Sequence, residues 1–158
     1  MPSASWEDVH AAEIAASNDD PVAEILAGQL YMGSHRTPGT VTSFDVLVGV
    51  ANDRLIKSSD HPNVIVHHFS IKDDGPPELD DRERALNAAR LVDMHITGGR
   101  RVLVTCLAGY NRSGWIVGLT LLHRGWTPKD AIKLMREKRG SNVLNNEFFE
   151  AIVLRRGG

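Results

Sequence analysis

Cys106, the only cysteine of the chain, and Arg112 are the residues whose types and spacing most directly suggest chemistry. A thiolate is a nucleophile, and a guanidinium can bind two oxygens of a phosphate at once. An apolar, β-branched run at 102–105 ends at the cysteine, small and polar residues follow at 107–111, and a second apolar run covers 115–122. The pattern predicts a strand, a loop that begins at the thiol and ends at the guanidinium, and a buried helix behind it.

The predicted loop is suited to bind a phosphate. Backbone amides at the N-terminus of a helix point at an anion, and the helix dipole adds positive charge there. The same field favours the thiolate form of Cys106, which would lie beneath a bound phosphoryl group as a nucleophile. Gly109 would let the backbone curl tightly around the ligand. We therefore expect substrate contacts from the loop residues Leu107, Ala108, Gly109, Tyr110, Asn111 and Arg112.

The pattern Cys106-x-x-Gly109-x-x-Arg112-Ser113 resembles the phosphate-binding loop of the cysteine-dependent protein tyrosine phosphatases, and most of all that of the dual-specificity phosphatases. The resemblance implies that Cys106 is the nucleophile, that Arg112 holds the phosphate oxygens and that Ser113 stabilises the departing thiolate. A lone cysteine at the end of a strand is ordinarily inert, so the prediction depends on the whole pattern. One position departs from the family, because Thr105 replaces its usual histidine. A threonine can donate a hydrogen bond but has no charge, so the residue at position 105 affects the fraction of Cys106 that is present as thiolate.

Hydrolysis of a phosphate ester also needs an acid that protonates the leaving oxygen. In the family this acid is an aspartate in a loop between a strand and a helix, upstream of the cysteine. Residues 70–78 of this chain have the composition of such a loop, and Leu79 aligns Asp73 with the acid of the family. Asp74 is the alternative, because a sequence pattern does not separate adjacent aspartates. Without the resemblance, these acidic residues before Gly and Pro would be ordinary turn and cap residues.

Strands and helices alternate along the rest of the chain. We expect a tight turn at Gly28 and strands at 30–32, 44–50 and 64–69. Amphipathic patterns predict helices at 5–17 and 79–96, one from Pro128 to a basic segment at 136–140, and one at 147–154. The basic segment suits a helix C-terminus and needs no ligand. Asn145 and Asn146 would cap the last helix, which would pack Phe148 and Ile152.

This alternation predicts an α/β fold with a short central, mostly parallel sheet and helices on both faces, as in the protein tyrosine phosphatases. The segment 25–34 resembles the opening strand of dual-specificity phosphatases, and the end of the chain resembles their closing helix pair. Because the resemblance spans roughly residues 20–154, we expect an N-terminal helical extension at 1–19 and a catalytic domain at 20–158.

The composition is that of one ordinary globular domain, with 158 residues, 42% of them hydrophobic, and a formal net charge of −2. The low charge argues against nucleic acid or an anionic membrane as a partner, and no apolar run approaches the ~20 residues of a membrane span. A single thiol suits a reducing cytoplasm. His67 and His68 adjoin on a strand and point to opposite faces, so a hydrogen-bonded structural role is expected rather than a metal site. No cofactor is expected.

Together, the residues and the resemblance predict an enzyme that hydrolyses a phosphorylated protein or another phosphomonoester through a phosphocysteine intermediate. Tyr110 would either stack on an aromatic substrate or simply pack. Two alternatives stay open. The Gly109-x-Asn111-Arg112-Ser113 variant is similar to the loop of RNA 5′-triphosphatases in the same superfamily. Thr105 is compatible with a pseudophosphatase that binds a phosphorylated partner without turnover, although retention of Cys106 and a candidate acid favours an enzyme.

Overall fold

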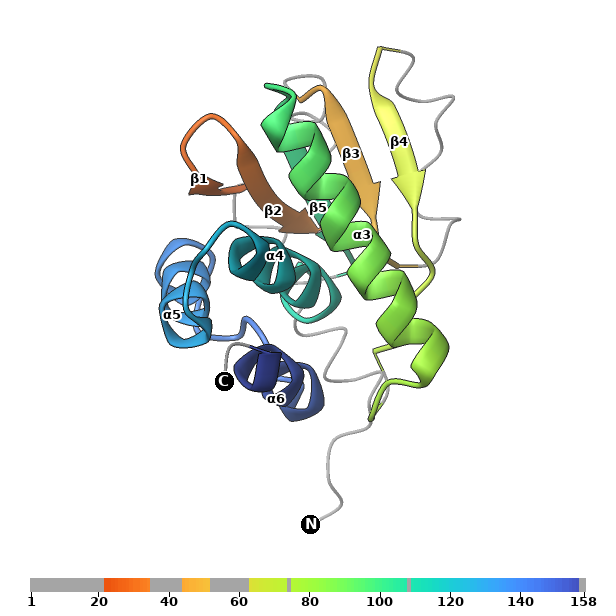
Figure 1. Ribbon diagram of the computed structural model, residues 1–158, viewed down its shortest axis with the longest axis vertical. Coiled ribbons are helices and arrows are strands. Elements are labelled where there is room, and N and C mark those ends of the chain that lie inside the picture. The colour runs from red at the N-terminus through yellow and green to blue at the C-terminus, as the bar shows by residue number, and fades with distance from the viewer. Residues whose placement is uncertain (1–21, 35–43, 52–62, 74, 108, 157–158) are drawn as a thin grey trace.

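A five-stranded sheet forms the centre of the computed structural model, which describes residues 22–34, 44–51, 63–73, 75–107 and 109–156. The strands are Ala23–Leu26 (β1), Leu30–Ser34 (β2), Val46–Gly49 (β3), Ile65–His68 (β4) and Val102–Cys106 (β5). Their order is β1-β2-β5-β3-β4, and every neighbouring pair is parallel except β1 and β2 (Figure 1). The predicted α/β fold with a mostly parallel sheet is therefore confirmed.

Strand β5 lies in the middle of the sheet because its side chains are apolar on both faces. All its residues are buried, as expected for a central parallel strand. Val102 and Val104 point into the larger core cluster, whereas Leu103 joins Phe44 and Leu47 in a smaller cluster on the opposite face. This burial fixes the register of β5, and with it the position of the residue that ends the strand.

The first strand was not predicted. The sequence indicated a turn at Gly28 followed by a strand, and the structure has a hairpin in which β1 pairs with β2. Gly28 has a φ of 69°, and the backbone N–H of Gln29 donates to Leu26 O at 3.0 Å. β1 escaped the sequence pattern because it is a four-residue strand at the edge of the sheet, too short for a clear alternation.

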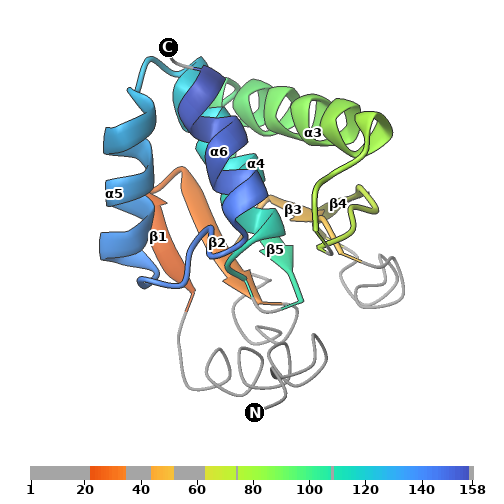
Figure 2. The same cartoon turned by 90° about the horizontal axis from the view of Figure 1, so that it is seen from below.

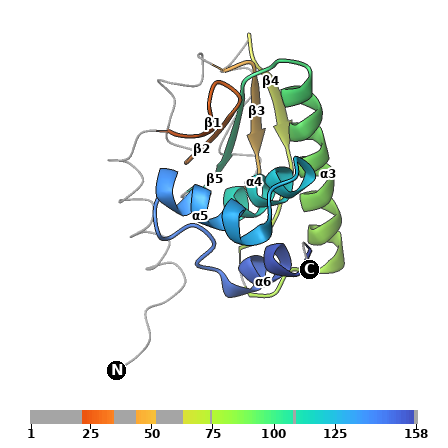
Figure 3. The ribbon, with the colours of Figure 1, turned by 60° about the vertical axis from the view of Figure 1, so that its left-hand side comes forward.

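The described helices are Leu79–Thr97 (α3), Arg112–His123 (α4), Pro128–Lys138 (α5) and Glu147–Arg156 (α6). Viewed along the sheet, α4 lies between α3 and α5 and behind α6, and the described helices all gather on one face (Figure 2). Of the predicted helices on both faces, the described residues therefore bear on this face alone. The larger core cluster occupies this interface, and α4 is buried along nearly its whole length. Figure 3 shows α3 running along the edge of this layer. None of the helices in the described ranges is long and apolar enough to cross a membrane.

The ends of the helices agree largely with the sequence pattern. Thr127 caps α5 by accepting from the N–H of Asp130 at 3.3 Å, and Pro128 is its first residue. The predicted packing of α6 is wrong by one residue, because Phe148 is 42% exposed and Phe149 is buried. Phe149 stacks on Trp115 with ring centroids 4.6 Å apart. The predicted helix at 5–17, and the boundary between the extension 1–19 and the catalytic domain 20–158, lie outside the described residues.

Candidate active site

Cys106 ends β5 at the carboxyl edge of the sheet, where parallel α/β folds bind ligands. Its side chain is buried at 3% exposure, and the backbone N–H of Gly109 donates to its Sγ at 3.3 Å. Ser113 Oγ also lies 3.3 Å from Sγ. Helix α4 begins at Arg112, earlier than its apolar run indicated, so Arg112 and Ser113 form its first turn. The structure therefore brings the predicted nucleophile, arginine and serine together around one loop, residues 106–112, which we call the phosphate loop.

The phosphate loop lies directly against strand β2. Gly109 has a φ of 83°, and a Cβ atom there would lie 2.6 Å from both the carbonyl carbon and the oxygen of Gly33. Gly33 in turn is paired in register with Thr105. Only glycine at 109 allows this approach, because a side chain would collide with backbone that cannot move away cheaply. Leu107 is half-buried, and Ala108 lies outside the described residues.

The side chain of Arg112 is oriented by the segment that follows β4, residues 69–73, which we call the acid loop. Arg112 is 8% exposed, and its Nη1 donates to the carbonyl oxygen of Ile71 at 3.1 Å. Among the described residues, the buried Nε of Arg112 has no hydrogen-bond partner. A buried N–H without an acceptor costs roughly 1–3 kcal/mol, so a group that accepted this hydrogen bond would stabilise the site. An anion bound in the phosphate loop would be such a group.

Asp73 lies in the same acid loop and is buried, with 6% of its surface exposed. Its Oδ1 accepts from the side-chain Nδ2 of Asn146 at 2.8 Å, and the backbone N–H of Asn146 donates to Asn111 Oδ1 at 2.8 Å. Asp73 is thus linked to the phosphate loop through one intervening residue. The alternative acid, Asp74, lies outside the described residues.

Tyr110 packs within the protein instead of extending toward a ligand. It is 4% exposed, and the guanidinium of Arg139 lies 4.8 Å from the centre of its ring. Arg139 is itself buried, and its Nε donates to the carbonyl oxygen of Gly109 at 3.2 Å. The sequence had assigned the basic segment 136–140 only to the helix dipole. Arg139 was therefore missed as a residue that supports the phosphate loop, since nothing in the local pattern separates it from its solvated neighbours.

No protein-family model and no curated protein matches the sequence. Solved structures do match. A mutant form of Tk-PTP is 26% identical, with a TM-score of 0.68 over 85% of this chain and 92% of that one. Human DUSP28 is 20% identical, with a TM-score of 0.73 over 87% and 93% of the two chains. OH1 from the Orf virus, a tyrosine phosphatase, is 17% identical, with a TM-score of 0.69 over 94% and 97%. The chain has the fold of the dual-specificity phosphatases. The fold that the sequence resemblance implied is therefore confirmed.

Within this dual-specificity phosphatase fold, Thr105 stands where the family usually has a histidine. Thr105 is buried, and in the part of the chain that the structure describes its Oγ1 has no hydrogen-bond partner. Within the described ranges, the hydroxyl therefore donates no hydrogen bond, although a threonine could do so. In the described part of the loop, the N–H of Gly109 and the hydroxyl of Ser113 contact Sγ of Cys106.

The histidine pair of the sequence belongs to a separate cluster, made of His67, His95 and Arg100. His67 Nε2 and His95 Nε2 lie 3.4 Å apart, and Arg100 Nη1 lies 3.4 Å from His95 Nδ1. Burial, then the charge of His68, lowers the pKa of His67. Burial, then the charges of His67 and Arg100, lowers the pKa of His95. His67 thus has a hydrogen-bonded role, and within the described ranges no three His, Cys, Asp or Glu side chains converge as metal ligands.

Proposed function

We propose that the protein is a cysteine-dependent phosphatase that hydrolyses phosphomonoesters. The observation that supports this most is the convergence on one loop of a buried thiol, a glycine N–H and a serine hydroxyl that contact it, and a buried arginine with an N–H that no described residue accepts. The fold shared with phosphatases, among them the tyrosine phosphatase OH1, supports the same reaction class.

In the first proposed step, Cys106 Sγ attacks the phosphorus atom and the bond between phosphorus and the leaving oxygen breaks. Asp73 gives its proton to that oxygen, which leaves as an alcohol or phenol. Arg112 and the backbone amides of the phosphate loop (106–112) hold the remaining phosphate oxygens. These donors stabilise the charge of the transition state, and the burial of Arg112 strengthens its interaction with that charge.

In the second step, a water molecule attacks the phosphocysteine. Asp73, now a carboxylate, accepts a proton from this water, and the bond between sulfur and phosphorus breaks. The sulfur leaves as a thiolate. The hydroxyl of Ser113, 3.3 Å from Sγ, is placed to donate a hydrogen bond to it, as the resemblance implies.

The proposed substrate is a phosphorylated protein or another phosphomonoester, in the cytoplasm. OH1, which has the same fold, is described as having triple substrate specificity, so the fold is compatible with more than one phosphorylated group. Because Tyr110 is buried, we do not assign it to substrate stacking. The hydroxyl of Thr105, which has no hydrogen-bond partner among the described residues, favours a second candidate, a protein that binds phosphate without turnover.

Hydrolysis of 4-nitrophenyl phosphate by the reduced protein tests the proposal. We expect turnover by the wild type and a loss on the order of 10³-fold or more in Cys106→Ser, because the serine hydroxyl is a much weaker nucleophile. Binding of inorganic phosphate or vanadate, followed by calorimetry, should persist in this variant. A wild type that binds these anions but never turns over would establish the binding protein instead. Activity near the wild-type level in a folded Cys106→Ser variant would overturn the mechanism.

A further inference from the structure

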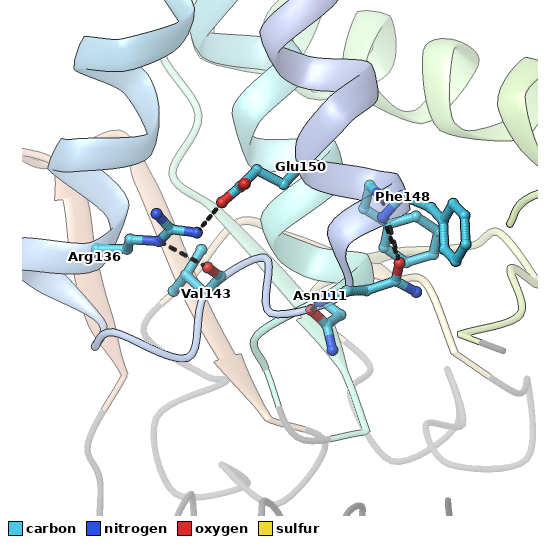
Figure 4. A network of polar contacts seen from close by, with 7 residues as sticks. Asn111, Arg136, Val143, Phe148 and Glu150 are labelled. Carbon is cyan, nitrogen blue, oxygen red and sulfur yellow. Dashed lines mark hydrogen bonds and ion pairs between the residues drawn. The ribbon is translucent and has the colours of Figure 1, made fainter. Parts of the chain in front are cut away.

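Asn146, the residue just before α6, contacts three parts of the molecule at once. Its side-chain Nδ2 donates to Asp73 Oδ1 at 2.8 Å, and its backbone N–H donates to Asn111 Oδ1 at 2.8 Å. Its own Oδ1 accepts from the backbone N–H groups of Phe148 and Phe149, at 3.0 and 3.4 Å. One residue therefore joins the acid loop (69–73), the phosphate loop (106–112) and the first turn of α6. Figure 4 shows Asn111 and Phe148 at this junction.

The chemistry of the contacts fixes which way the amide of Asn146 faces. The N–H groups at the start of α6 need an acceptor, and only Oδ1 of the amide can accept them. The amide nitrogen then necessarily faces Asp73, where a carboxyl oxygen accepts its hydrogen bond. Turning the amide over would place two donors against the helix N–H groups and an oxygen against a carboxyl oxygen. The hydrogen bonds that cap α6 and the hydrogen bond to Asp73 therefore require the same orientation of the Asn146 amide.

Two contacts between described residues hold the acid loop against the phosphate loop. One is the hydrogen bond from Arg112 Nη1 to Ile71 O, and the other is the link from Asp73 through Asn146 to Asn111. The first contact fixes the backbone of the acid loop. The second acts on the carboxyl group itself, which must be in place if the leaving oxygen is to be protonated.

We propose that Asn146 is the positioning residue for the general acid, an inference that depends on the proposed phosphatase function. Oδ1 of Asp73 can accept the hydrogen bond from Asn146 both when the carboxyl group is protonated and when it is ionised. The proton is therefore directed to Oδ2. From Oδ2 it passes to the leaving oxygen in the first step, and to Oδ2 a proton returns from water in the second. Asn146 keeps the carboxyl group in one orientation through both steps.

Asn146→Ser tests this role while keeping the other contacts. Serine caps a helix about as well as asparagine and adds no charge, and the backbone N–H to Asn111 stays. Only the donor to Asp73 is lost. Phenyl phosphate has a leaving oxygen about as basic as that of tyrosine, with a pKa of about 10, whereas 4-nitrophenyl phosphate leaves readily. We expect kcat to fall by roughly 10- to 100-fold on phenyl phosphate and much less on 4-nitrophenyl phosphate, with KM nearly unchanged on both.

The matched control is Asn142→Ser, an exposed asparagine before the same helix, which should behave like the wild type on both substrates. In an Asp73→Asn background, Asn146→Ser should cause no further loss, because there is no longer an acid to position. Equal losses of Asn146→Ser on both substrates, or a full additional loss in that background, would show a merely structural role and overturn the inference. Either outcome would leave the proposed function standing, because the wild type would still hydrolyse the substrates and Cys106→Ser would still be inactive. Failure of the proposed function would instead appear as a wild type that hydrolyses neither substrate.

Discussion

The phosphate loop (106–112) and the histidine cluster (His67, His95 and Arg100) both place an arginine beside a buried titratable side chain, Cys106 in one and His95 in the other, yet only one has the features of a binding site. In the histidine cluster the partners satisfy each other. Arg100 can only donate, so His95 Nδ1 accepts from it and His95 Nε2 bears the hydrogen that is donated to His67. No lone pair of His95 is left for a cation. In the phosphate loop, by contrast, an N–H of the buried arginine finds no acceptor among the described residues. The unsatisfied N–H of Arg112, rather than nearby charge, distinguishes the candidate site from the histidine cluster.

The largest expected effect is the loss of activity in Arg112→Lys, for which the same change at Arg100 is the comparison. Arg112→Lys removes the planar fork and replaces it with a point charge that cannot hold two phosphate oxygens in the same geometry. We expect kcat/KM for 4-nitrophenyl phosphate to fall by about 10²–10³-fold, as for other losses of a transition-state donor. Arg100→Lys, in the histidine cluster, should leave kcat/KM unchanged. Equal effects of the two variants would break the distinction between the regions.

Two glycines with the same backbone conformation sharpen the comparison. Gly109 and Gly99 both have a φ of 83°, but a Cβ at Gly99 would meet no atom within 4 Å. Gly99→Ala should therefore cost only the left-handed backbone term, about 1–2 kcal/mol in the free energy of unfolding. Gly109→Ala should cost a further ~1–3 kcal/mol, because the new methyl group collides with Gly33. It should also lower kcat/KM, because a shift that relieves this collision moves the N–H of residue 109, which donates to Cys106 Sγ.

Urea unfolding of the two alanine variants, each beside the wild type, measures this difference. The two midpoints should separate clearly, and only the Gly109 variant should lose hydrolysis. Equal destabilisation of the two variants would mean that the phosphate loop has room to move away from β2, contrary to the close contact seen with Gly33.

The sequence predicted the parts of the site that are local in the chain. Cys106, Arg112 and Ser113 lie within one strand, loop and helix, so their spacing alone places them together. The partners that orient them are distant in sequence. Gly33 belongs to another strand, and the carboxyl group that Asn146 contacts lies 73 positions earlier in the chain. A pattern of residue types cannot report such contacts, which depend on how the elements pack.

The errors in the fold have a similar cause. Periodicity predicted the long α3 closely, because nineteen residues repeat the pattern several times. It missed β1, which is too short to show a period. It also placed Phe148 in the core, since two adjacent phenylalanines give no sign of which one faces inward. The capping role of Asn146 was predicted correctly from its residue type. The contact with Asp73 uses the other end of the same amide and left no signal in the local sequence.

The smallest expected effect is the contribution of the histidine cluster to the pH dependence of the free energy of unfolding. Burial lowers the pKa of both His67 and His95 from the usual 6.5. Between these lowered pKa values and pH 6.5, the folded protein therefore binds fewer protons than the unfolded chain. The free energy of unfolding should then be highest above pH 6.5 and should fall as the pH drops from 6.5 through the lowered pKa values of the folded state. His95→Gln removes one of the two groups, and its urea midpoint should depend less on pH than that of the wild type.

Met94→Gln, an exposed neighbour on α3, is the matched control and should keep the pH dependence of the wild type. Among the described residues, the charged or titratable groups that act on His95 are His67 and Arg100, and His68 acts on His67. Gln at position 95 therefore leaves His67 and His68 in place. If the wild type and His95→Gln lost stability equally between pH 7 and pH 5, the acid sensitivity would originate elsewhere in the protein. The histidine cluster would then be only a packed contact between β4 and α3.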